Sequence, residues 1–107
     1  MSDTHTRNDA IISEYADDPD LLDLVERFVE ELPRRIAALQ LKLNEQDFQS
    51  LAGLAHQLKG AAGGYGFSSI TDSAAALERS ARVPESLDRL AQELQYLADL
   101  CRRAKAR

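Results

Sequence analysis

One stretch of the sequence, AHQLKGAAGGYG at residues 55–66, combines a histidine and a lysine with four of the chain's five glycines. His56 and Lys59 are three residues apart, so on a helix both side chains lie on one face. A neutral imidazole is a nucleophile near pH 7, and a lysine ammonium can pair with a phosphoryl dianion. This combination favours a histidine that exchanges phosphoryl groups with another macromolecule.

On a helical wheel, at about 100° per residue, the stretch and the turn before it predict one apolar face and one nearly bare face. The apolar face comprises Leu51, Leu54, Leu58, Ala61, Ala62 and Tyr65. His56 lies opposite, among residues that are mostly small. Glycine costs a helix about 1 kcal/mol relative to alanine, so an ordinary solvated face would carry better helix formers. We therefore expect an exposed His56 on a docking surface for a partner protein. The residues predicted for this surface are Ala52, Gly53, Gln57, Gly60, Gly63 and Gly64.

Two other interpretations of this stretch stay open at the level of the sequence. His56 could be an ordinary surface histidine, and the glycines could mark close packing against another helix. A site for ATP is not expected, because no glycine-rich strand-to-helix loop or Walker-type lysine motif is present. Metal binding is not expected either, because the only other histidine is His5, near the N-terminus, and no cysteine lies at metal-ligand spacing from His56.

The elements that must position His56 are predicted to be helices. Asp18 followed by Pro19 is typical of a helix start, and apolar residues then recur every three or four positions as far as Leu43. Pro33 interrupts this stripe, so we expect two helices, at about 19–32 and 33–45, that are closely joined or kinked at the proline.

Three further helices follow in the prediction. The first runs from an N-cap at Asp47 to about Tyr65, where Gly66 is expected to adopt a left-handed conformation. The next begins near Ser68, and the last opens at Pro84. The expected fold is all-α: an antiparallel up-down four-helix bundle with a short additional N-terminal helix. Residues 1–17 are expected to form a flexible arm, and residues 18–107 the bundle domain.

Composition excludes several classes of function. The chain of 107 residues carries a net charge of −5, which argues against nucleic-acid binding. The basic tail RRAKAR, residues 102–107, could be an exception that binds nucleic acid, but we favour its interpretation as a helix C-terminus, where cations complement the helix dipole. The sequence has neither a membrane-spanning segment nor a signal peptide, so we expect a cytoplasmic protein. Cys101 is the only cysteine and is expected to be a small buried hydrophobe, with a reactive thiol as the alternative.

The stretch HQLKGAAGGYG, residues 56–66, resembles the phosphorylation motif of histidine-containing phosphotransfer (HPt) domains of bacterial multistep phosphorelays. That motif is a histidine, any residue, an aliphatic residue, Lys, Gly, two small residues, and a glycine ten positions after the histidine. The resemblance extends over most of the chain, because residues 17–39 also look like the first helices of the family.

The resemblance implies that His56 is phosphorylated on Nε2, that Lys59 assists the phosphoryl group and that Gly60 gives the partner room. It also implies that Glu78, 22 positions after His56, can hydrogen-bond Nδ1; the alternative is a solvated surface glutamate. The implied partners are receiver domains of response regulators or of hybrid histidine kinases, which supply the aspartate and Mg²⁺, so that no cofactor is needed in this chain.

The function expected from the sequence is therefore a phosphorelay carrier that takes a phosphoryl group from an aspartyl phosphate onto His56 and passes it to another aspartate. No ATP-binding or dimerisation domain is present, so kinase activity is not expected, and a freestanding monomeric carrier is favoured. The main alternative is a non-catalytic interaction module that binds or inhibits a receiver domain or kinase. A plain structural helical domain is a third possibility, but it leaves the glycines unexplained.

Overall fold

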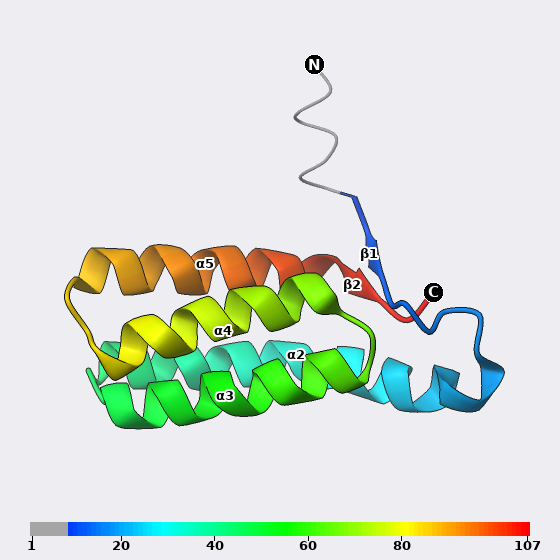
Figure 1. Cartoon of the computed structure of the whole chain (residues 1–107), viewed down its shortest axis with the longest axis horizontal. Coiled ribbons are helices and arrows are strands. Elements are labelled where there is room, and N and C mark those ends of the chain that lie inside the picture. Colours follow the sequence, from blue (N-terminus) through cyan, green and yellow to red (C-terminus); the bar gives the residue numbers. More distant parts are fainter. Residues whose placement is uncertain (1–8) are drawn as a thin grey trace, which may run out of the picture.

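The computed structural model describes residues 9–107, which form an all-α bundle of four helices with two very short strands. The helices are α2 (Pro19–Asn44), α3 (Phe48–Gly64), α4 (Ser68–Arg82) and α5 (Leu87–Arg103). Consecutive helices run in opposite directions (Figure 1), and each packs against two others, so that the four surround one core. Within residues 9–107, each helix is too short or too polar to cross a membrane.

The first helix, α2, is continuous through Pro33, so the predicted division into two helices is wrong. Proline in a helix interior costs about 3 kcal/mol, because one backbone hydrogen bond is lost and the ring crowds the preceding turn. Pro33 lies on the exposed side of α2, whereas Leu32, Ile36 and Leu39 are buried and stay in phase across it. Burying these three side chains stabilises the continuous helix by more than the proline costs.

Side chains that accept hydrogen bonds from backbone N–H groups set where three of the helices begin. The carboxylate of Asp18 accepts from the N–H of Asp20, and that of Asp47 accepts from the N–H of Ser50, as predicted for both caps. The last helix does not open at Pro84. It begins at Leu87, because the Ser86 side chain accepts from the N–H of Arg89 and caps the helix three residues later than expected.

In the described part of the segment before α2, residues 9–18 form a strand and a turn, and the expected additional helix is not found there. β1 (Ile11–Ile12) pairs in parallel with β2 (Ala104–Lys105), which directly follows α5. The basic tail therefore continues past the helix end as a strand. Of the predicted arm, residues 1–8 lie outside the described residues. Residues 11–14 are hydrogen-bonded to β2 and to the turn between α3 and α4, so β1 lies beside β2 (Figure 1).

The turn between α3 and α4 is held by the segment that follows β1. Gly66 has the predicted left-handed conformation, with φ of 85°. The Ser13 hydroxyl donates to the carbonyl of Tyr65 at 2.7 Å, and the N–H of Glu14 donates to the carbonyl of Gly66 at 2.8 Å. A Cβ at residue 66 would approach Ser13 Oγ to 2.8 Å and the Glu14 nitrogen to 2.9 Å. A glycine is therefore required here both by the backbone angle and by the close approach of the N-terminal segment.

Gly66→Ala is expected to lower the free energy of unfolding by about 2–3 kcal/mol, through left-handed strain and the displacement of the residues that contact it. Urea denaturation followed by circular dichroism measures this loss. Gly64→Ala is the matched control, because a Cβ at residue 64 meets none of the described atoms within 4 Å. Equal stability of the two variants would contradict this account of the turn.

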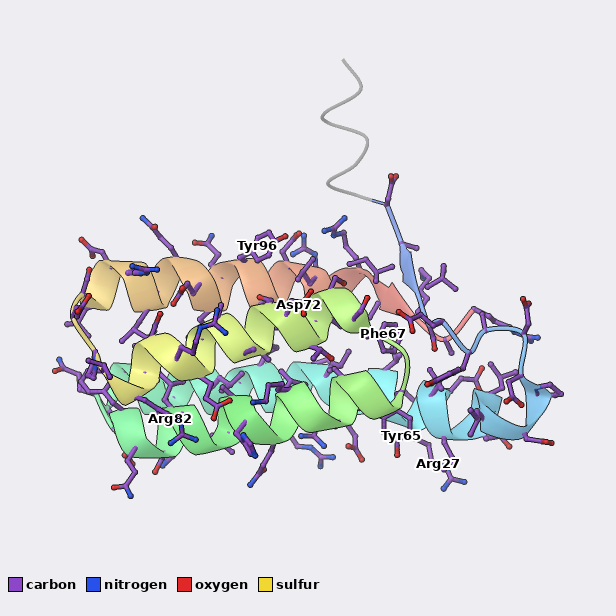
Figure 2. All side chains as sticks on the ribbon, viewed as in Figure 1. Arg27, Tyr65, Phe67, Asp72, Arg82 and Tyr96 are labelled. Atoms are coloured by element: carbon purple, nitrogen blue, oxygen red, sulfur yellow. The ribbon has the colours of Figure 1, made fainter. Side chains whose placement is uncertain are left out.

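Aromatic and aliphatic side chains fill the core on either side of the same turn. The Phe28 ring on α2 stacks on Tyr65 at a centroid distance of 5.0 Å and lies 5.9 Å from the ring of Phe67. Figure 2 shows Tyr65 and Phe67 together where α3 passes into α4. Cys101 is 6 % exposed, and burial raises the pKa of its thiol to about 12. The thiol therefore stays protonated at neutral pH, as expected for a small buried hydrophobe.

Candidate functional site

His56 lies on the exposed side of α3, next to α4, with 61 % of its side chain accessible to solvent. Its Nδ1 is 3.1 Å from Oε2 of Glu78 on α4. The two residues are 22 positions apart, and the antiparallel packing of α3 and α4 brings them together. The solvated alternative for Glu78 is therefore wrong, since this residue is only 7 % exposed and contacts the imidazole.

Glu78 fixes which ring nitrogen of His56 carries the proton. Its pKa is lowered to about 2 by hydrogen bonds from Lys59 and Arg82, so the carboxylate is ionised at neutral pH. An ionised carboxylate only accepts hydrogen bonds, so Nδ1 of His56 must be the donor. In the neutral imidazole, Nε2 then carries the lone pair. Nδ1 is hydrogen-bonded to Glu78, and most of the side chain is exposed to solvent. Nε2 is therefore the ring nitrogen that is available as a nucleophile.

Two cations share the Glu78 carboxylate with His56. Lys59 Nζ lies 2.9 Å from Oε1, so the predicted lysine is part of the cluster. Arg82, whose role was not predicted from the sequence, places Nη2 at 2.6 Å and Nε at 3.0 Å from Oε2. Figure 2 shows Arg82 near the end of α4, beside α3. A spacing of four residues between an acid and an arginine on one predicted helix is a signal that could have found it.

The exposed face of α3 is rotated relative to the predicted one. Ala52 was expected at the docking surface, but its side chain is 2 % exposed. The prediction for Ala52 is wrong because α3 packs against both α2 and α4, so its buried side is wider than a single apolar stripe suggests. The other residues of the predicted surface are exposed or half-buried, and they lie on one side of the helix: Gly53, Gln57, Gly60, Gly63 and Gly64.

The packing of the bundle does not account for most of these glycines. Among residues 9–107, a Cβ added at Gly53, Gly60 or Gly64 would meet no atom within 4 Å, so each of these positions has open space beside it. Gly63 differs, because a Cβ there would lie 3.4 Å from Thr71 Oγ1 on α4. Close packing against another helix, the alternative left open by the sequence, therefore applies at most to Gly63.

The cluster around Glu78 predicts a specific dependence of stability on pH. The pKa of Glu78 lies below its ordinary value of 4.5 in the folded protein, so its ionised form stabilises the fold above about pH 4.5, and this contribution is lost as the pH falls towards 2. Over this interval, we expect the free energy of unfolding of wild type to fall by about 1–2 kcal/mol more than that of Glu78→Gln. The expected difference is this small because Arg82 and Lys59 are partly solvated, which screens their interaction with Glu78. Chemical denaturation of both proteins from pH 7 to pH 2 measures the difference, and parallel pH profiles would contradict it.

The described residues offer no evident place for a metal ion. Within residues 9–107, the histidine, cysteine and acidic side chains do not form a group of three that could hold a metal. His5, the other histidine of the chain, lies outside the described residues. The site itself presents an imidazole oriented by Glu78 and flanked by the ion pairs of Lys59 and Arg82.

Comparison with known proteins agrees with this geometry. The family model described as "Hpt domain" matches residues 23–106, which is more than three quarters of the chain. No curated protein and no solved structure gives a match. The match includes all the residues of the His56 cluster and most of the four-helix bundle. The chain therefore belongs to the Hpt domain family, whose members carry phosphoryl groups on histidine in the phosphorelays of two-component signalling.

Proposed function

We propose that His56 accepts a phosphoryl group from the aspartyl phosphate of a receiver domain and passes it to the aspartate of a response regulator. The observation that carries this proposal is the hydrogen bond between Nδ1 of the exposed His56 and the ionised Glu78, at 3.1 Å. This bond leaves Nε2 unprotonated and aimed away from α4. An imidazole in this state needs no further activation to act as a nucleophile at neutral pH.

The transfer step uses three side chains of the cluster. The lone pair of His56 Nε2 attacks phosphorus, and the bond between phosphorus and the aspartate oxygen breaks, so that the electron pair leaves with the carboxylate. The Nδ1 proton stays in place, and the imidazole ring gains positive charge that the Glu78 carboxylate stabilises. Lys59, one helical turn from His56, supplies positive charge for the phosphoryl oxygens.

The partner surface of this proposal is the exposed side of α3. Gly53, Gly60 and Gly64 leave open space there, which allows the backbone of α3 to be approached closely by a receiver domain. The aspartate and the Mg²⁺ needed for transfer belong to the partner, so this chain acts without a cofactor of its own. We place the carrier in the cytoplasm, as a monomer with no kinase activity.

Incubation with a panel of phosphorylated receiver domains tests the proposal. We expect the wild-type protein to acquire label that is lost in acid and retained in base, which is the behaviour of a phosphoramidate rather than of a phosphoserine or an acyl phosphate. Adding an unphosphorylated receiver should then remove the label. No transfer from any receiver that phosphorylates a known Hpt domain under the same conditions would count against the proposed function.

A further inference from the structure

Two cations pair with the same buried carboxylate, although one would be enough to compensate its charge. Glu78 is 7 % exposed, and it is approached by Lys59 at Oε1 and by Arg82 at Oε2. Oε2 also accepts the hydrogen bond from His56 Nδ1. The imidazole and the two cations therefore depend on the position of a single side chain.

The two cations differ in how firmly they are held. Arg82 follows Glu78 by four residues on α4 and places two nitrogens of its planar guanidinium on one oxygen. Lys59 comes from α3, and its Nζ, at the end of a flexible four-carbon chain, contacts the Glu78 carboxylate through Oε1. Lys59 is therefore the cation that can leave Glu78, and Arg82 is the one that stays.

Movement of Lys59 to a phosphoryl group has a consequence for Glu78. A buried carboxylate that loses its partner is strongly destabilised, and the loss opposes any step that causes it. With Arg82 in place, the charges of Glu78 and Arg82 cancel, and Oε2 remains paired. The charge of Lys59 then becomes available to a dianion on His56 Nε2.

We propose that Arg82 is a positioning residue, which keeps Glu78 paired and oriented while Lys59 moves from Oε1 of Glu78 to the phosphoryl group on His56. This inference rests on the proposed function of His56 and adds a division of roles between the two cations. Arg82 acts through Glu78 and does not contact the reacting atoms.

A double-mutant cycle tests this division of roles without any partner protein. Wild type, Arg82→Gln, Lys59→Gln and the double variant are phosphorylated with phosphoramidate, and the initial rate is followed by phosphorus NMR. We expect each single variant to react about tenfold more slowly than wild type. The double variant should be less than twofold slower than Arg82→Gln, because Lys59 cannot leave Glu78 once Arg82 is removed.

Two matched variants separate positioning from a general loss of structure. Arg79→Gln removes an exposed arginine from the same helix outside the cluster, and its rate should equal that of wild type. Arg82→Lys should recover part of the rate lost in Arg82→Gln, and it also replaces that variant in the cycle if Arg82→Gln fails to fold. The tautomer of His56, measured by nitrogen NMR, should shift away from Nδ1–H in Arg82→Gln and return towards it in Arg82→Lys.

The outcomes separate the role of Arg82 from that of His56. The role of Arg82 would be overturned if the fold losses of the two single variants multiplied in the double variant, or if the tautomer of His56 were unchanged in Arg82→Gln. Either result would leave the role of His56 intact. If wild-type His56 takes no label, the proposed function fails, and the division of roles fails with it.

Discussion

Replacing His56 with glutamine should abolish transfer from a phosphorylated receiver domain, with a loss of more than about 1,000-fold. The glutamine amide has no nucleophilic nitrogen, but it can still donate a hydrogen bond to the carboxylate of Glu78. The residue is exposed, so the bundle should unfold at nearly the same denaturant concentration as wild type. Label on the protein after incubation with the phosphorylated receiver measures the effect.

A second variant tests whether the position of the imidazole matters as well as its presence. In the double variant His56→Gln and Gln57→His, the histidine is moved one residue along α3, which turns it by about 100° around the helix. The new imidazole remains exposed but is directed away from Glu78 and α4. We expect it to take less than one hundredth of the wild-type label. Persistent labelling of His56→Gln would disprove the role of His56, and full signalling by His56→Ala in cells would favour a non-catalytic interaction module.

The sequence predicted the helical content and the exposure of His56 because both depend on local spacing. The apolar residues of α3 to α5 recur with helical periodicity, and the positions of Asp47 and Gly66 follow from backbone groups that lie next to them. The contact between His56 and Glu78 came from resemblance, since periodicity alone cannot say which side chain of a second helix faces the first.

The errors in the prediction arise where two or more elements act together. α2 stays helical through Pro33 because its apolar stripe is buried in the core. The known effect of proline on an isolated helix does not include that packing energy. Ala52 was predicted to be exposed because a helical wheel takes no account of neighbouring helices. In the structure, α3 packs against two of them, α2 and α4. β1 depends on pairing with β2 at the other end of the chain, and neither two-residue segment has a period that could be recognised.

Enlarging Gly60 should separate access by a partner from the chemistry of His56. A side chain at this position meets nothing within 4 Å in the bundle, and replacing a helix glycine with glutamine is expected to raise the free energy of unfolding by about 0.5–1 kcal/mol. In a complex, the same side chain would occupy the space that the partner backbone needs, one turn from His56. We expect Gly60→Gln to slow transfer from a phosphorylated receiver by about 100-fold, which corresponds to about 2.7 kcal/mol.

The small donor phosphoramidate shows whether this loss comes from exclusion of the partner. It needs no docking surface, so Gly60→Gln should react with it within about threefold of wild type. The matched control is Ala91→Gln, which adds the same side chain at an exposed position of α5, a helix that packs against α4 and α2; both reactions should be unchanged in it. An equal loss with both donors would mean that glutamine disturbs the His56 cluster itself. Unchanged transfer from the receiver would mean that the partner reaches Nε2 without approaching Gly60, and that the open glycines of α3 serve some purpose other than clearance.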